Sequence, residues 1–193
     1  MGKETWRVFL ALDLPLPVIE RIGEIQSRFR SDWPHFRWVS PRNIHLTLHF
    51  LGDTPRHKIR QLEGLGTLPS LQEAVSLRLG QLGVFPRWSD PRVLWLSVEG
   101  DLAPLIRLHK ETGGFIRSLG LSSENRPFSP HITLARIPPQ RLGSQANPEG
   151  LKDYALSGEY GFFLPSLTLY RSELTPGGPV YTPCFSCKLK EKS

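Results

Sequence analysis

Two copies of a four-residue pattern, histidine–apolar–threonine–apolar, are the clearest source of chemistry in this sequence. The first copy spans residues 45–48 (HLTL) and the second spans residues 131–134 (HITL), 86 positions later in a chain of 193 residues. The chain holds only six histidines, so a second chance match is improbable, whereas one copy alone would carry little weight. The two copies are separated by close to half the chain length.

The spacing within each copy has a mechanical meaning if the motifs lie in β-strands. Residues two apart in a strand share a face, so His45 and Thr47 point one way while the leucines beside them point into the core. His131 and Thr133 repeat this arrangement with apolar residues opposite. Each strand therefore offers one imidazole and one hydroxyl on a single polar face.

Two imidazoles and two hydroxyls suit acid–base chemistry at phosphorus. Histidine has an ordinary pKa of about 6.5, so one of a pair can be neutral at neutral pH while the other carries a proton. One takes a proton from the attacking water or hydroxyl and the other protonates the leaving oxygen, each contributing about 10²–10⁴-fold in rate. A threonine hydroxyl donates to a phosphate oxygen without adding charge. Metal binding is the competing use of histidine, but neither motif contains a carboxylate or a cysteine, so we expect no metal and no cofactor.

The doubled motif resembles that of the two-histidine (2H) phosphoesterase superfamily. Within it, the chain is similar to the bacterial and archaeal RNA 2′,3′-cyclic phosphodiesterases, also called 2′-5′ RNA ligases. Further matching segments follow one another in the family's order along nearly the whole chain: RVFLALDLP at 7–15, VSPRNI at 39–44, RVLWL at 92–96, RPFSP at 126–130, YRSEL at 170–174 and GPVY at 178–181.

The resemblance implies an α+β fold that is bilobal, with two pseudo-symmetric lobes of antiparallel sheet and outer helices flanking a central cleft. Residues 1–193 would form one domain of two intertwined lobes, each presenting one motif to the cleft. The implied reaction opens a 2′,3′-cyclic phosphate at an RNA end to a 2′-phosphomonoester without a metal. His45 would be the proton donor and His131 the proton acceptor, with Thr47 and Thr133 on the non-bridging phosphate oxygens. The residues alone do not decide which histidine is the acid.

Arg136 follows the second histidine by five positions, as in the family, which implies contact with phosphate. Strand alternation puts it on the face opposite His131 unless the strand bulges or ends. The first copy has Phe50 at the equivalent position, and alternation places that ring in the core. His49 shares the parity of His45, and we expect it at most to border the site.

Other aromatic and imidazole side chains are weaker candidates. Three aromatic residues are able to stack on a nucleobase, although core or rim packing is their commoner role: Phe85, Trp88 and Tyr181. We expect the remaining histidines to be solvated: His35, His57 and His109.

The elements that must position these residues alternate between helix and strand. Apolar periodicity predicts helices at 15–29, 55–65 and 102–119. Strands are predicted at 6–13, 37–39, 44–51, 75–84, 93–98, 131–137, 154–163, 167–170 and 180–189, with a loop at 31–37 and a surface loop or short helix at 138–150. Short connections between strands indicate an α+β protein with a mostly antiparallel sheet, and no linker separates two domains.

Composition sets broad limits on function. The net charge is +6 at pH 7, and 17 arginines against 7 lysines favour anionic partners, since the guanidinium fork suits phosphate. A charge of this size is equally compatible with a role in solubility alone.

No apolar run approaches the roughly 20 residues of a membrane span, and the first residues are not apolar enough for a signal peptide, so we expect a cytoplasmic protein. Cys184 and Cys187 lie three apart in a predicted strand, which favours reduced structural thiols over a metal site.

Two alternatives to hydrolysis remain open at this level. The same two histidines would serve 2′-5′ RNA ligation or cleavage of 2′-5′ linkages, because hydrolysis and ligation share one site by microscopic reversibility. A non-catalytic RNA-binding module is the second alternative, and it lacks an RNA-recognition signature or a long Lys/Arg run. The expected partner is RNA with a 2′,3′-cyclic phosphate terminus or a small cyclic nucleotide, with no membrane and no obligate protein partner.

Overall fold

The computed structural model describes residues 4–122, 127–139, 148–152, 154 and 161–190. Within these residues, nine strands form one sheet in the order β7-β4-β5-β6-β3-β1-β8-β9, with β2 pairing to β6 beside this path. The strands are β1 (Thr5–Leu12), β2 (Arg37–Trp38), β3 (Leu46–Pro55), β4 (Ser76–Arg87), β5 (Asp90–Gly100), β6 (His131–Arg136), β7 (Gly161–Phe163), β8 (Ser166–Thr175) and β9 (Gly178–Lys188). Every strand pair is antiparallel, which confirms the predicted α+β class.

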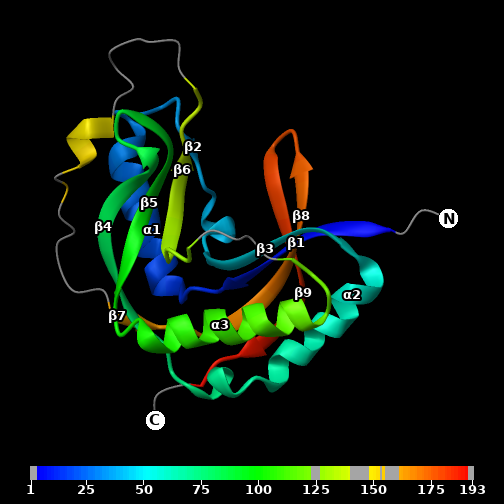
Figure 1. The fold of residues 1–193 in the computed structure, drawn as a ribbon. Coiled ribbons are helices and arrows are strands. Elements are labelled where there is room, and N and C mark those ends of the chain that lie inside the picture. The colour runs from blue at the N-terminus through cyan, green and yellow to red at the C-terminus, as the bar shows by residue number, and fades with distance from the viewer. Residues whose placement is uncertain (1–3, 123–126, 140–147, 153, 155–160, 191–193) are drawn as a thin grey trace.

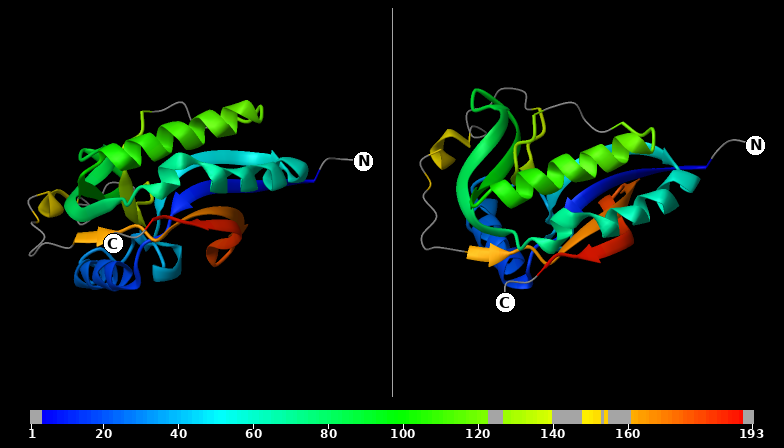
Figure 2. Two further views of the ribbon diagram at one scale, coloured as in Figure 1. Left: turned by 90° about the horizontal axis from the view of Figure 1, so that it is seen from below. Right: turned by 60° about the horizontal axis from the view of Figure 1, so that its bottom comes forward.

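Two long helices and several short helical turns surround the sheet (Figure 1). The helices are α1 (Leu16–Arg30), α2 (Arg56–Gln61) and α3 (Ala103–Ser118), and the 3₁₀ turns are η1 (Pro41–Asn43), η2 (Leu62–Thr67), η3 (Pro69–Gln72) and η4 (Pro148–Leu151). In Figure 2, the blue α1 and the green α3 lie on opposite sides of the strands. None of the helices in the described part of the chain is both long and apolar enough to span a bilayer.

The two long helices tie the sheet together across its middle. Gln26 of α1 donates from Nε2 to the carbonyl oxygens of Val39 and Leu134, both at 2.9 Å. Helix α1 thus follows β1 in the chain but packs against β6. Helix α3 follows β5 in the chain, and its Thr112 hydroxyl lies 3.0 Å from His49 Nε2 on β3. Each helix therefore contacts strands from the other half of the sheet.

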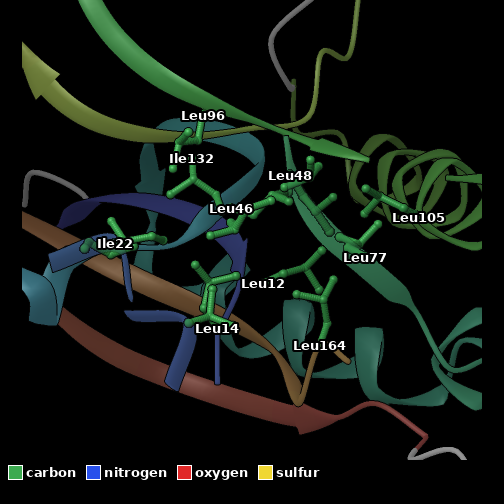
Figure 3. Packing of buried hydrophobic residues seen from close by; sticks show 14 of the residues in the cluster. Leu12, Leu14, Ile22, Leu46, Leu48, Leu77, Leu96, Leu105, Ile132 and Leu164 are labelled. Atoms are coloured by element: carbon green, nitrogen blue, oxygen red, sulfur yellow. The ribbon is translucent and has the colours of Figure 1, made fainter. Parts of the chain in front are cut away.

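The two halves of the sheet meet at one residue pair. β3 and β6 are in register only at Leu46 and Ile132, and both side chains are 0% exposed. Figure 3 shows these two residues close to Leu96 and Leu12 of the neighbouring strands. This junction between the halves, the Leu46–Ile132 seam, therefore lies at the centre of the hydrophobic core.

Most predicted elements are present with shifted ends. The helix predicted at 55–65 is α-helical only to Gln61 and continues as η2, where Gly64 approaches the Phe115 ring so closely that a Cβ would lie 2.7 Å from it. The strands predicted at 75–84 and 93–98 extend into one long hairpin, β4–β5. Of the strand predicted at 154–163, the structure shows Gly161–Phe163, and 155–160 lie outside the described residues, as do 140–147 of the predicted loop.

Candidate active site

The Leu46–Ile132 seam brings the two sequence motifs together. In an antiparallel register, the neighbours of a paired residue face each other in the opposite order, so His45 lies across from Thr133 and Thr47 lies across from His131. The paired Leu46 and Ile132 are buried in the core, so these four polar side chains occupy the other side of the strands. We call this side the histidine face.

Both imidazoles are held in the same orientation by the main chain. The Nδ1 atom of His45 lies 2.7 Å from the Asn43 carbonyl oxygen, and Nδ1 of His131 lies 2.7 Å from the Ser129 carbonyl oxygen. A carbonyl only accepts, so each Nδ1 carries the hydrogen, and a neutral ring then has a free lone pair on Nε2. His45 Nε2 lies 3.0 Å from the Thr47 hydroxyl, which donates to it. The arrangement leaves Nε2 as the ring nitrogen that is not bonded to the main chain in each histidine.

Aromatic side chains surround His45. Its ring centroid is 4.9 Å from that of Phe9 and 5.5 Å from that of Tyr181, which meets it edge-on at 82°. Phe9 also stacks on Tyr170 at 5.4 Å. These contacts desolvate the imidazole, and burial lowers the pKa of His45. The Asn43 carbonyl and the charge of Asp13 raise it in part, while the charge of His131 lowers it further.

A second aromatic group surrounds His131. Phe85 meets the ring edge-on at 4.9 Å and 82°, and Trp95 lies 6.0 Å from it. Trp95 lies over Gly83 of β4, where a Cβ would come within 2.2 Å of the indole, so the glycine is what allows this ring position. Phe85 thus packs against a histidine rather than standing free, and Trp88 packs against the core.

A β-bulge carries Arg136 to the histidine face. β5 pairs Trp95 with Thr133 and Leu94 with Ala135, so Leu134 is the extra residue on β6. The extra residue resets the alternation, which returns Arg136 to the side of His131. Arg136 is exposed, and its charge acts on Tyr181: burial raises the pKa of that phenol, and the charges of Arg136 and Arg7 offset part of the rise.

A matching bulge in β3 corrects two sequence predictions. β1 pairs Ala11 with Thr47 and Leu10 with His49, so Leu48 is the extra residue. Phe50 is consequently 47% exposed instead of lying in the core, and it contacts Phe9 on the histidine face at 5.9 Å. His49 is only 4% exposed and points away from His45, toward α3.

His49 belongs to a buried cluster behind β3. Its Nε2 lies 3.1 Å from the His109 carbonyl oxygen and 3.0 Å from the Thr112 hydroxyl, and its ring stacks on His109 at 4.3 Å. Burial, together with the nearby charges of His109 and Arg117, lowers the pKa of His49 to about 4. His109 is half-buried and stacks on Phe128 at 4.0 Å, so the prediction that it is solvated is wrong: the helix face that carries it packs on β3.

The remaining histidines and the two cysteines lie outside the histidine face. His57 is exposed as predicted, whereas His35 is half-buried against Phe36. Cys184 and Cys187 are free, half-buried thiols whose pKa is raised by burial. No group of three or more His, Cys, Asp or Glu side chains in the described ranges is arranged to hold a metal ion.

Sequence reasoning missed two residues of this site. Arg7 shares strand parity with Phe9, and its charge reaches Tyr181. Asp13 lies one residue past the end of β1, and its charge reaches His45. Both belong to the RVFLALDLP segment, in which the charged residues at 7 and 13 share the odd-numbered face with Phe9. Because alternate residues of a strand share a face, this odd numbering is the sequence feature that could have placed both residues beside Phe9.

Comparison with known proteins agrees with this geometry. The family described as LigT like Phosphoesterase matches residues 12–95. The RNA 2′,3′-cyclic phosphodiesterase of Methanocaldococcus jannaschii is 30% identical over 178 residues, which cover 91% of this chain and 96% of that protein. The chain belongs to the LigT-like phosphoesterases.

Two solved structures support the assignment of this chain to the LigT-like phosphoesterases. A Thermus thermophilus protein has a TM-score of 0.76 at 29% identity and covers 95% of this chain and 97% of its own. LigT of E. coli, complexed with 3′-AMP, has a TM-score of 0.74 at 29% identity and covers 97% and 100%.

Proposed function

We propose that this LigT-like phosphoesterase opens the 2′,3′-cyclic phosphate at an RNA end and leaves a 2′-phosphomonoester. The observation that carries the proposal is the Leu46–Ile132 seam, which sets two imidazoles, each with Nδ1 bound to a carbonyl, among two threonines on one face. The relative from Methanocaldococcus jannaschii is named as an RNA 2′,3′-cyclic phosphodiesterase, and E. coli LigT has been solved in complex with 3′-AMP. Both support RNA ends, or small cyclic nucleotides, as the substrate.

The proposed reaction is a displacement by water at phosphorus. His131 accepts a proton from water through Nε2 as the water oxygen bonds to phosphorus. The bond from phosphorus to the 3′ oxygen breaks, and Nε2 of His45 donates a proton to that oxygen. Thr47 and Thr133 donate hydrogen bonds to the non-bridging oxygens, and the Arg136 guanidinium contacts the same phosphate. The two histidines end with exchanged protonation states, which solvent then resets.

The substrate itself supplies charge that the acid needs. Burial lowers the pKa of His45, so the ring is mostly neutral at pH 7 without substrate. A cyclic phosphodiester carries one negative charge, and an opposite charge within a few ångströms favours the protonated imidazole. Substrate binding therefore raises the pKa of His45 and prepares it to donate.

We infer further that the two halves of the sheet are pseudo-symmetric lobes of a single domain with a central cleft at the seam. Their pairing supports this inference. Leu12 pairs with Leu46 in one half as Leu96 pairs with Ile132 in the other. Each half then places its bulge two residues later, at the second apolar residue of the motif. Equal registers with equal bulges are expected of a duplicated unit.

End-group analysis of a short RNA with a 2′,3′-cyclic phosphate tests the proposal. We expect a 2′-phosphomonoester product and continued turnover in the presence of a chelator, because the proposed proton transfers need no metal. His45→Ala and His131→Ala are each expected to lower turnover by at least about 10²-fold, the usual contribution of one acid or base. The matched control is His57→Ala, which removes an exposed histidine and leaves turnover unchanged.

The same assay separates the alternatives. A 3′-phosphate product, or full activity of either active-site variant, would contradict the proposal. Salt-sensitive RNA binding without any product would instead favour a non-catalytic RNA-binding module. Joining of a cyclic-phosphate end to a 5′-hydroxyl RNA, or cleavage of a 2′-5′ linkage, would assign ligase or 2′-5′ phosphodiesterase chemistry to the same two histidines.

A further inference from the structure

The two halves of the sheet differ in charge at one equivalent position beside the histidines. Asp13 directly follows Leu12, the last residue of β1 paired with β3, and so lies across from His45. In the other half, β5 pairs Ser97 with His131. The repeated register therefore sets a carboxylate beside the first imidazole and a neutral hydroxyl beside the second.

The Asp13 carboxylate accepts hydrogen bonds from three hydroxyl groups of β8. Its Oδ2 accepts hydrogen bonds from Ser166 at 2.5 Å and from Thr168 at 2.6 Å, and its Oδ1 accepts one from Tyr170 at 2.6 Å. In the described part of the chain, no lysine or arginine pairs with Asp13, so its charge is not neutralised locally.

We propose that Asp13 is a positioning residue that makes His45, rather than His131, the proton donor, because its fixed negative charge favours the imidazolium form of the ring beside it. This inference rests on the proposed hydrolysis. The neutral Ser97 offers His131 no such charge, which leaves that ring free to act as the base. An otherwise repeated pair of motifs thus becomes an acid and a base through one carboxylate.

The other groups around His45 do not supply this negative charge. On its own strand, the Asn43 carbonyl and the Thr47 hydroxyl are neutral. Tyr181 of β9 is an uncharged phenol whose pKa burial raises. Among the described residues, the other ionic groups whose charges act on His45 or Tyr181 are His131, Arg136 and Arg7, and each is cationic when charged.

The influences on the pKa of His45 act in opposite directions. Burial lowers the pKa of His45 most, and the charge of His131 lowers it as well. The Asn43 carbonyl and Asp13 raise it. Asp13 is the one ionic group among these that favours a protonated His45.

Asp13→Asn tests the proposal, because it keeps the side-chain shape and removes the charge. We expect the NMR titration midpoint of the His45 imidazole, measured without substrate, to fall by roughly one pH unit, the low end for loss of a nearby opposite charge. The alkaline limb of kcat/KM is expected to move in the same direction, which lowers kcat/KM about tenfold at pH values above that midpoint. Asp13→Glu retains the charge and is expected to recover part of the shift.

Two further variants make the result decisive. Asp32→Asn is the matched control, since it removes an exposed carboxylate in the loop after α1, and it is expected to leave the His45 titration unchanged. If Asp13→Asn fails to fold, Ser97→Asp adds a carboxylate beside His131 and is expected to raise the titration midpoint of that ring.

The outcomes separate this inference from the proposed function. A folded Asp13→Asn variant with reduced thermal stability and an unchanged His45 titration would overturn the inference and leave Asp13 a structural residue. An unchanged His131 titration in Ser97→Asp would overturn it as well. Absence of cyclic-phosphate hydrolysis by the unmodified protein would defeat the proposed function, whereas the imidazole titrations need no substrate and stand apart from that result.

Discussion

His45 and His131 are residues of the same type, and they differ in the side chains that surround them. His45 and His131 have the same main-chain bond from Nδ1, at 2.7 Å in both cases. Phe9 and Tyr181 desolvate the first ring, while Phe85 packs edge-on against the second. Because Nδ1 is bonded in the same way in both rings, the two histidines differ in the side chains that surround them.

Arg136 is a single side chain whose contact with the substrate phosphate can be tested by kinetics. Replacing Arg136 with alanine removes a guanidinium from the histidine face, and we expect kcat/KM for a cyclic-phosphate RNA to fall about 10- to 100-fold, mainly through KM, as for loss of a charge-assisted contact of about 1.5–3 kcal/mol. Arg136→Lys is expected to recover only part, since lysine lacks the planar fork. Steady-state kinetics measure both values. Arg92→Ala, an exposed arginine of β5 that pairs with Asp90, serves as control, and equal KM values for Arg136→Ala and Arg92→Ala would contradict a phosphate contact.

Strand bulges are the elements that shape the site. Without the bulges at Leu48 and Leu134, strict alternation would put Phe50 in the core and Arg136 behind the sheet. The bulge in β3 also turns His49 into the interface with α3, where Gly113 leaves room for it: a Cβ there would lie 3.1 Å from the imidazole. One extra residue per strand therefore changes which side chains lie on the histidine face and which lie on the opposite side of the sheet.

The packing of α3 on β3 makes stability depend on pH. The pKa of His49 falls from 6.5 to about 4 in the folded protein, so the unfolded chain binds a proton in this range that the folded chain does not. Stability is therefore lost as pH falls from above 6.5 to 4, by about 3 kcal/mol for this group. His49→Gln is expected to flatten the dependence by a similar amount in urea unfolding series at several pH values. His57→Gln, at an exposed position, is expected to keep the slope of the unmodified protein, and a His49→Gln series parallel to it would refute the assignment.

At the scale of the whole molecule, the two halves of the sheet pair directly at the Leu46–Ile132 seam. Leu46 is fully buried, and Leu46→Ala is expected to lower the free energy of unfolding by about 2–5 kcal/mol, the usual cost of such a cavity. Urea unfolding measures this loss. Turnover is also expected to fall, because His45 is the next residue. Leu16→Ala, at a side chain that is 66% exposed, is the control and is expected to change stability by less than about 0.5 kcal/mol; a comparably small loss for Leu46→Ala would mean that the seam does not hold the halves together.

Local features of the sequence were sufficient to predict which residues share the histidine face and most of the helices and strands. The spacing of His45 and Thr47, repeated at His131 and Thr133, needs only the two-residue period of a strand, and the apolar rhythm of α1 and α3 needs only the helical period. Tertiary structure alone decided the bulges and the surroundings of each imidazole. A bulge depends on a partner strand, and the carboxylate of Asp13 is held by hydroxyl groups 153 to 157 positions away. Interactions over that distance arise only when the strands pair, so no pattern within one segment contains them.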